Sequence, residues 1–341
     1  MNAMKKILPI GLVITTLLLV ACCEENDNPI PPQPLTALQN DSLALVDLYN
    51  ATAGSAWTIK WTLTTPVHEW QGVTVANNRV TELRLSSNNL TGTLPESAGS
   101  LTALRYCDFS DNRLSGAVPE TIKRLMQLEY LDLSENMLTG NFPIISALTK
   151  LWMFDISSNN FTALPEFYKL TALKYLAFRK NNLSGNLPDL SALTALIYLD
   201  ASFNNFSGII PSIWSSLTKM RVLFLYKNSL SGSIPAYITT FTALKELALD
   251  DNDFTGNIPV NLGYLPTLSK LWLAQNNLTG TIPQSLLDNP HWSEWKDEVC
   301  PQQSGFGFSN CTGSLASASV MQVKKSIILE NVKEKYKTAL Q

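Results

Sequence analysis

Three aspartates recur at one place in a repeated hydrophobic pattern, and their spacing could support chemistry. Asp108, Asp132 and Asp155 are separated by 24 and 23 residues, and each stands between two hydrophobic residues. If they lie on three adjacent strands, neighbouring carboxylates would be about 5 Å apart. That separation matches the carboxylate pair of a retaining glycosidase. Carboxylates this close would also raise one pKa or attract a cation such as calcium.

Other features of the sequence argue against this hydrolase hypothesis. A parallel strand face is open and shallow, so it has no pocket that excludes water, and an open groove favours recognition over hydrolysis. The chain has only two histidines, and it contains no G-x-S-x-G, H-E-x-x-H or phosphate-loop motif. We therefore expect a non-enzymatic protein with no catalytic residue, no metal and no cofactor.

Composition excludes further classes of protein. The net charge is −3 and charged residues make up 16% of the chain, whereas a nucleic-acid partner would require a basic stripe. Hydrophobic residues make up 45% and the mean hydropathy is +0.04, which excludes a disordered chain and a protein with many membrane spans.

The aspartates belong to a ninefold internal repeat. Each copy follows the pattern L-x-x-L-x-L-x-x-N-x-L, and eight of the nine copies continue with G-x-[hydrophobic]-P. The recurrent asparagines are Asn88, Asn112, Asn136, Asn159, Asn181, Asn204, Asn228, Asn252 and Asn276. One copy cannot bury its own leucines, so residues 80–291 are predicted to stack as coils around one continuous core.

This pattern resembles the leucine-rich repeat, and the L-x-G-x-I-P extension is similar to the plant-type class of that family. The resemblance implies an α/β repeat solenoid that is curved, with a parallel β-sheet on its concave face. The asparagines are expected to point inward and to bridge the backbones of neighbouring coils, which is a structural role. The fourth copy lacks the glycine at residues 161–165 and is two residues short, which predicts irregular curvature around residues 128–195.

A solenoid needs a cap at each end. Residues 35–79 are predicted to form a helical N-terminal cap, with an amphipathic helix that starts at Asp41. The segment resembles the N-terminal cap of plant-type repeat proteins, but the usual cap cysteines are missing. We therefore expect Trp57, Trp61 and Trp70 to close this end.

Residues 292–312 are predicted to form the C-terminal cap. Cys300 and Cys311 have ten residues between them, and in an oxidising compartment that spacing suits a disulfide that closes the last coil. Cys107 stands at a core leucine position and is expected to be a buried thiol. Residues 313–341 have hydrophobic residues at helical spacing with lysines between them, which predicts an amphipathic helix. We favour a helix on the cap or a loose tail over a partner-binding helix.

The first 34 residues resemble the export segment of bacterial lipoproteins. Two lysines precede a short apolar stretch that ends in L-V-A-C at Cys22, and this stretch is too short to span a bilayer. The resemblance implies a signal peptide at residues 1–21, lipidation of Cys22 and a proline-rich tether at residues 22–34. Acidic residues directly after the cysteines look like the surface-export signal of some Gram-negative lipoproteins. We therefore expect a monomeric outer-membrane lipoprotein on the cell surface.

We number the positions of each copy from the first leucine of the pattern L-x-x-L-x-L-x-x-N-x-L. Positions 2, 3, 5, 7 and 8 are expected to be solvent-exposed on the concave face and available to ligands. Position 3 carries four tyrosines, which supply the rigid contact area typical of binding hot spots. Two alternatives remain: the aspartates could be repeat consensus, and the tyrosines could simply stack across strands. The candidate ligand-binding residues are Tyr106, Asp108, Tyr130, Asp132, Trp152, Asp155, Tyr175, Arg179, Tyr198, Asp200, Phe203, Phe224, Tyr226 and Trp272.

Three functional hypotheses follow from these residues. The first is a lipid-anchored recognition or adhesion module that binds a protein or peptide on the concave face, as the receptor ectodomains and inhibitors of this repeat class do. The second is glycan binding, with aromatic rings stacked on sugars and aspartates accepting hydrogen bonds from hydroxyls. The third is the hydrolase that would use the aspartate row.

Overall fold

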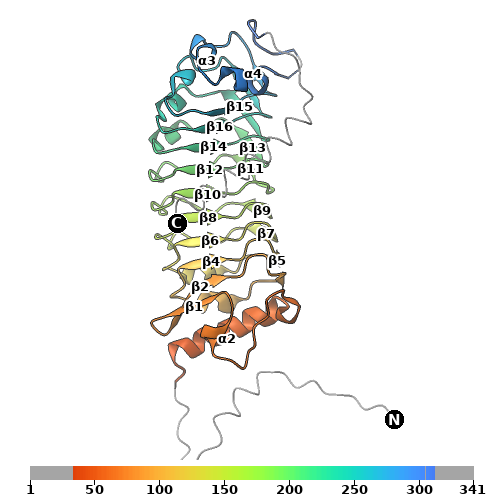
Figure 1. The fold of residues 1–341 in the computed structure, drawn as a ribbon, viewed down its shortest axis with the longest axis vertical. Coiled ribbons are helices and arrows are strands. Elements are labelled where there is room, and N and C mark those ends of the chain that lie inside the picture. The colour runs from red at the N-terminus through yellow and green to blue at the C-terminus, as the bar shows by residue number, and fades with distance from the viewer. Residues whose placement is uncertain (1–33, 304, 312–341) are drawn as a thin grey trace, which may run out of the picture. The chain divides into compact units, whose positions relative to one another are not determined.

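The computed structural model describes residues 34–303 and 305–311. From Thr36 onward the described residues form one compact unit, in which coils stack one on the next between the helix α2 and the helices α3 and α4 (Figure 1). The signal peptide, the lipidation of Cys22, most of the tether and the helix predicted for residues 313–341 lie outside the described residues. Within the described residues, no helix is both long enough and apolar enough to cross a membrane.

The N-terminal cap begins with α2 (Ala37–Ala51). Thr36 and Gln39 form a capping box, since the Thr36 Oγ1 accepts from the Gln39 N–H at 3.3 Å and the Gln39 Oε1 accepts from the Thr36 N–H at 2.7 Å. These two bonds satisfy N–H groups that the helix itself leaves unpaired. The predicted start at Asp41 was therefore wrong, because the T-x-x-Q box places the start one turn earlier.

Asp41 instead joins the cap helix to the first repeat. Its carboxylate is 1% exposed and accepts from Arg79 Nε at 2.8 Å, from Arg79 Nη2 at 3.0 Å and from the Val80 N–H at 2.8 Å. A buried carboxylate with three donors and an opposite charge is well compensated. The cap helix is thus tied to the edge of the sheet by one side chain.

Tryptophan packing closes this end, as predicted. The cap also contains the short 3₁₀ turns η2 (Gly54–Ala56) and η3 (Val67–Glu69). The ring centroids of Trp57 and Trp61 are 4.8 Å apart, and those of Trp61 and Trp70 are 4.9 Å apart. All three side chains are at most 4% exposed. They bury large apolar area at the end of the core, where no further coil can do so.

The concave face of the solenoid is a ten-stranded sheet. β1 (Val73–Ala76) pairs antiparallel with β2 (Arg79–Arg84), through a turn at Asn77 and Asn78 whose φ angles of 50° and 58° are positive, a conformation that asparagine tolerates. The remaining strands are parallel, one from each following copy. They are β4 (Tyr106–Asp108), β6 (Tyr130–Asp132), β8 (Met153–Asp155), β10 (Tyr175–Ala177), β12 (Tyr198–Asp200), β14 (Val222–Phe224), β16 (Glu246–Ala248) and β18 (Lys270–Trp272).

A second series of short strands lies directly after the recurrent asparagines of the repeat. It is split into two sheets, and the break falls after the short fourth copy. The first sheet contains β3 (Thr91–Gly92), β5 (Arg113–Gly116), β7 (Met137–Asn141) and β9 (Asn160–Ala163). The second sheet contains β11 (Ser184–Asn186), β13 (Asn205–Gly208), β15 (Ser229–Ser233), β17 (Asp253–Gly256) and β19 (Asn277–Leu278). The missing glycine of this copy therefore interrupts the ladder.

Short 3₁₀ helices return the chain to the next concave strand. Four of them begin directly after the proline of the G-x-[hydrophobic]-P motif, and that proline holds an extended backbone conformation at their N-caps. These helices are η4 (Glu96–Ser100), η5 (Glu120–Arg124), η6 (Ser212–Ser216) and η7 (Ala236–Thr240), and η8 (Leu262–Tyr264) follows in the next copy.

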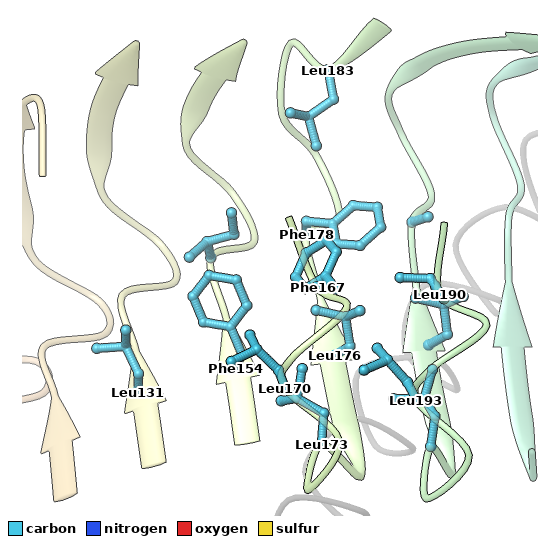
Figure 2. Close-up of a cluster of buried hydrophobic side chains, with 14 of the residues drawn as sticks. Leu131, Phe154, Phe167, Leu170, Leu173, Leu176, Phe178, Leu183, Leu190 and Leu193 are labelled. Atoms are coloured by element: carbon cyan, nitrogen blue, oxygen red, sulfur yellow. The ribbon is translucent and has the colours of Figure 1, made fainter. Parts of the chain in front are cut away.

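The leucine positions merge into one core, as predicted. Figure 2 shows Leu131, Phe154 and Leu176 from successive strands among the side chains of this interior, and all three are fully buried. Cys107 occupies a leucine position in the same core as a buried free thiol, which confirms that prediction.

The recurrent asparagines bridge the backbones of neighbouring coils, as predicted, and we call this row the asparagine ladder. Asn136 illustrates it. Its Nδ2 donates to the Phe109, Leu133 and Ser134 carbonyls at 2.9, 3.2 and 3.1 Å, and its Oδ1 accepts from the Leu114 N–H at 2.9 Å. The amide thereby satisfies buried backbone groups of two adjacent coils.

The C-terminal cap consists of α3 (Gln284–Leu287) and α4 (Trp292–Val299). The Glu298 carbonyl accepts from the Leu273 and Ala274 N–H groups at 2.8 and 2.9 Å, so the end of α4 occupies the place of a further coil. The predicted disulfide between Cys300 and Cys311 is present, with the two Cα atoms 6.0 Å apart.

Candidate functional site

The strand register aligns the candidate residues in two rows on the concave face. Position 3 places Tyr130 next to Tyr106, and Tyr198 next to Tyr175. Position 5 places Asp108, Asp132 and Asp155 directly opposite one another on β4, β6 and β8. Residues two apart on a strand point to the same side, so both rows share one face. The predicted juxtaposition of the aspartates is confirmed.

The middle of this face is buried, which corrects the prediction that these positions are exposed to solvent. Tyr175, Tyr198 and Phe224 are 0% exposed, whereas Tyr106 and Asp108 near the N-terminal end are half-buried. The physical reason is that large side chains on strands about 4.8 Å apart pack on one another. They form a second hydrophobic cluster, separate from the core, which we call the concave cluster. Its members are Tyr130, Met153, Tyr175, Ala177, Tyr198, Val222, Phe224, Tyr226, Ala248 and Trp272.

Aromatic contacts run along the concave cluster. Tyr106 and Tyr130 stack with centroids 4.0 Å apart, and Trp152 meets Tyr130 edge-on at 5.8 Å. Farther along, Phe224 meets Tyr198 edge-on at 6.0 Å and Trp272 at 6.4 Å. Offset-stacked and edge-on pairs are the favourable geometries for aromatic rings. The structure therefore contains the cross-strand stacking that was the alternative to ligand contact for the tyrosines.

Burial also fixes the protonation of the tyrosines. It raises the pKa of Tyr175 and of Tyr198 well above the ordinary value, and the nearby carboxylates add to this shift. Desolvation and negative neighbours both disfavour the phenolate. The two residues therefore remain neutral phenols in the folded protein.

The aspartates of position 5 bond to serines of the same copies. Asp132 Oδ1 accepts from the Ser134 N–H at 2.9 Å and from its Oγ at 2.6 Å. The same pair of bonds joins Asp108 to Ser110 and Asp200 to Ser202, and the Ser157 N–H donates to Asp155 at 2.9 Å. An aspartate carboxylate commonly accepts a hydrogen bond from the backbone N–H of the residue two positions later in the chain. The repeat-consensus alternative for the aspartates thus has a structural basis.

Two hydrogen bonds link the tyrosine row to the aspartate row. The Tyr130 hydroxyl donates to Asp132 Oδ2 and the Tyr175 hydroxyl donates to Asp155 Oδ2, both at 3.4 Å. Asp132 and Asp155 are 0% exposed, so a hydrolase would find no water-accessible pair here. Among the described residues, no group of three or more histidines, cysteines and acidic side chains is arranged to hold a metal ion.

Phe203 is half-buried on this face. It has a φ of 54°, and the residue directly before the recurrent asparagine has a positive φ in every copy. The Arg179 guanidinium lies 4.9 Å from its ring centroid, the Lys227 ammonium lies 4.7 Å away, and the Tyr226 ring meets it edge-on at 5.1 Å. Two cations against one ring form cation–π contacts. These contacts hold two charged groups beside one aromatic ring at the margin of the concave cluster.

Sequence reasoning included Arg179 but left two other cations that border the aromatic residues out of the predicted site. The Arg84 guanidinium lies 3.6 Å from the Tyr106 ring centroid, and Lys227 contacts Phe203. Neither residue was among the predicted site residues, although Arg84 occupies position 5 and Lys227 occupies position 8. A basic residue next to an aromatic of the neighbouring copy was the signal that could have identified both.

Carboxylates are concentrated on the concave face as well. Apart from Asp41, every buried carboxylate among residues 34–303 and 305–311 belongs to it: Asp132, Asp155, Asp200, Glu246 and Asp250. Burial raises the pKa of Asp200, while Arg179 and Ser202 act in the opposite direction. Charge burial of this kind is costly unless cations or donors compensate it.

A model described as a leucine-rich repeat region matches residues 79–289. The chain therefore belongs to the leucine-rich repeat family, and the solenoid described above is its fold. None of the curated protein sequences compared with the chain matches it significantly.

Solved structures similar to this one include plant receptors bound to peptides. The ectodomain of the receptor kinase GASSHO1/SCHENGEN3 from Arabidopsis thaliana, in complex with CASPARIAN STRIP INTEGRITY FACTOR 2, is 31% identical over 73% of this chain, with a TM-score of 0.67. The plant peptide hormone receptor RGFR1 in complex with RGF2 is 34% identical over 58% of this chain, with a TM-score of 0.56. This chain covers only 31% and 32% of those two receptor chains.

A plant ice-binding protein is similar over more of its own length. It is 26% identical over 72% of this chain and 82% of its own, with a TM-score of 0.62. The repeats of this chain are thus similar to those of plant proteins with different functions, and no catalytic family is indicated.

Proposed function

We propose that this protein is a non-enzymatic binding module that receives a protein or peptide on its concave face. The observation that carries the proposal is the concentration of aromatic side chains in the concave cluster, together with the nearby carboxylates and the cations beside Phe203. Aromatic and arginine side chains dominate the energetics of protein interfaces. The similar plant receptors bound to peptides support the same class of partner.

The half-buried residues are where a partner makes its first contacts. Tyr106, Trp152, Arg179 and Phe203 are partly accessible at the margins of the concave cluster. We test this with a phage-displayed peptide library selected on the intact protein. A selected peptide should lose at least about tenfold in affinity on Phe203→Ala, the effect of a typical hot-spot residue. Tyr264→Ala is the matched control, because Tyr264 is 65% exposed and lies outside the concave cluster.

The glycan alternative has weaker support from the geometry. Stacking on a sugar requires an exposed aromatic face, and Tyr175 and Tyr198 cover each other's faces at 4.3 Å. A glycan array separates the two hypotheses. Binding that Trp152→Ala and Phe203→Ala abolish would favour glycans, whereas an empty array together with selected peptides would favour a peptide partner.

We also propose that the protein is held in the cell envelope as an outer-membrane lipoprotein on the cell surface. The L-V-A-C motif at Cys22 and the acidic residues after it support this location. Mass spectrometry of the mature N-terminus tests the anchor, since an acylated Cys22 is expected and an unmodified terminus at another residue contradicts it. External protease treatment of intact cells tests the orientation, because a surface-exposed solenoid is digested and a periplasmic one is protected.

A further inference from the structure

Five cations mark the edge at which the chain enters the concave sheet. The segments that lead into β8, β10, β12, β14 and β16 are residues 147–152, 171–174, 194–197, 218–221 and 242–245. They contain five lysines or arginines and no aspartate or glutamate, in a chain whose net charge is −3. We call these cations the basic edge: Lys150, Lys174, Lys219, Arg221 and Lys245.

Position 2 places three of these cations in one row with two hydrophobic residues. The Lys174 N–H donates to the Trp152 carbonyl at 2.9 Å, and the Ile197 N–H donates to the Lys174 carbonyl at 2.9 Å. The Arg221 N–H donates to the Ile197 carbonyl and the Lys245 N–H donates to the Arg221 carbonyl, both at 2.8 Å. Each residue of the row thus lies one strand spacing, about 4.8 Å, from the next. Trp152 and Ile197 pack against the concave cluster, so the row is continuous with that cluster.

The three cations of this row have no charged partner among residues 34–303 and 305–311. Lys174, Arg221 and Lys245 take part in no ion pair and in no side-chain hydrogen bond there. Lys174 and Arg221 are exposed, and Lys245 is half-buried. Their charges are therefore open to carboxylates that another molecule supplies.

Nearer the N-terminus, position 2 shows how a carboxylate pairs with a cation in this row. Arg105 and Glu129 occupy position 2 of adjacent copies, and the Glu129 N–H donates to the Arg105 carbonyl at 2.8 Å. The Arg105 Nε and Nη2 donate to the two carboxylate oxygens of Glu129 at 2.9 and 3.0 Å, a bidentate pair. Arg221 has Lys245 at the corresponding place in the next copy. A carboxylate beside Arg221 must therefore come from a partner.

The buried carboxylates of the concave face determine where an acidic partner would fit. They include Glu246 at position 3 and Asp132, Asp155 and Asp200 at position 5, and position 5 lies about 10 Å along the strand from position 2. Like charges disfavour a second carboxylate at the centre of the face. An acidic partner therefore keeps its carboxylates at the basic edge and turns apolar side chains toward the concave cluster.

We infer that the basic edge binds an acidic, extended segment of the peptide or protein partner. Its carboxylates pair with Lys174, Arg221 and Lys245, and its apolar side chains contact Trp152 and Ile197. The inference rests on the proposed function and deepens it, because it states the charge of the partner and the edge along which the partner runs. Lys174 and Arg221 are two strand spacings apart, about 10 Å. Three residues of a polyproline II chain span about 9 Å and return to the same side, so acidic residues three positions apart match this pair.

Selection of a phage-displayed peptide library on the full chain tests the inference. We expect the selected peptides to be enriched at least about threefold in aspartate and glutamate over the unselected library. Fluorescence anisotropy then measures the affinity of one synthetic selected peptide for the parent and for Arg221→Glu combined with Lys245→Glu. This charge reversal should weaken binding at least about tenfold.

The matched control is Lys123→Glu combined with Arg124→Glu. This pair changes the same residue types and the same net charge, but it lies in η5, outside the concave sheet, and it should change the affinity by less than about twofold. A peptide whose acidic residues are replaced by asparagine or glutamine tests the same contacts without altering the protein. It should bind the parent at least about tenfold more weakly than the original peptide does.

The outcomes separate this inference from the proposed function. Selected peptides without acidic enrichment, or acidic peptides that bind the charge-reversed protein as tightly as the parent, overturn the basic edge alone, and the Phe203→Ala test of the concave face still stands. Heparin serves as a polyanion of a different class. If no peptide is selected while heparin binds the parent and not the charge-reversed protein, the occupant is a glycan and both proposals fail. Both also fail if neither probe binds.

Discussion

The phenol rings of Tyr175 and Tyr198 stack with their centroids 4.3 Å apart and their planes 3° apart. The two residues are directly opposite each other on β10 and β12, so the repeat register alone brings them together. Their contact lies outside the leucine core, in the concave cluster. The face proposed to bind a partner is therefore also a packed part of the fold.

The first prediction concerns the contribution of this stack to stability. Tyr175→Ala should lower the free energy of unfolding by about 3 kcal/mol, as large-to-small changes of buried aromatics do. Tyr175→Phe keeps the ring and removes the hydroxyl, which donates to Asp155 at 3.4 Å, so it should cost about 1 kcal/mol. Urea denaturation measures both. An alanine variant as stable as the parent would mean that the concave cluster is not packed in solution.

Much of this architecture was predictable from the sequence, because the repeat determines both the strand register and the residues of the core. The nine asparagines gave the register, the leucines gave the core, and the spacing of Cys300 and Cys311 predicted the disulfide. The start of the cap helix was missed because the T-x-x-Q box at Thr36 was overlooked in favour of an acidic residue one turn later. Where two residues could cap the same helix, the helix starts at the one whose capping box forms two reciprocal hydrogen bonds.

The burial of the concave face was not predictable in the same way. Alternation along a strand determines that Tyr175 and Asp155 point away from the leucine core. It does not determine whether that side meets water, because burial depends on neighbours from other copies and on any segment that lies across the sheet. The consensus nature of L-D-L-S was visible in the sequence, but the bonds from Ser134 and Ser202 that explain it required coordinates.

The second prediction concerns the link between cap and repeats. Asp41→Asn should lower the free energy of unfolding by about 2 kcal/mol, somewhat less than the loss of a fully buried pair, because the Arg79 side chain is 27% exposed. The control is Glu129→Gln, which breaks the exposed pair with Arg105 and should cost at most about 1 kcal/mol. Thermal or urea unfolding of the two variants measures the contrast. Equal effects would show that Asp41 does not anchor α2.

The third prediction concerns pH. Burial raises the pKa of Asp200, so the native state holds this proton more tightly than the unfolded state does. The contribution of Asp200 to stability must therefore fall as pH rises from the unfolded pKa through the raised native pKa. Asp200→Asn removes this dependence, and the variant should gain stability relative to the parent as pH rises above about 4.

The control for this prediction has the opposite sign. Hydrogen bonds from Ser191 lower the pKa of Asp189, so its contribution is present above the unfolded pKa and is lost as pH falls through the native pKa. Asp189→Asn should therefore lose stability relative to the parent as pH rises toward about 4, and the difference should stay constant above that pH. Urea titrations at several pH values measure both slopes, and equal slopes for the two variants would contradict the assignment.

The last prediction concerns the end of the asparagine ladder, where Gln302 takes the place of a tenth asparagine. Its Oε1 accepts from the Leu278 N–H at 3.3 Å, and its Nε2 donates to the Leu273 and Val299 carbonyls at 3.1 and 2.7 Å. Gln302→Ala should cost about 1 kcal/mol, since the groups it frees at the half-buried end can bond to water. Asn136→Ala should cost at least about 2 kcal/mol, because it orphans buried backbone groups in the middle of the ladder. Hydrogen exchange gives the decisive contrast: the Gln302 variant should lose protection at Leu278 only, whereas the Asn136 variant should lose protection across several coils. A Gln302 variant that loosened the whole solenoid would instead show that the C-terminal cap governs the stability of every copy.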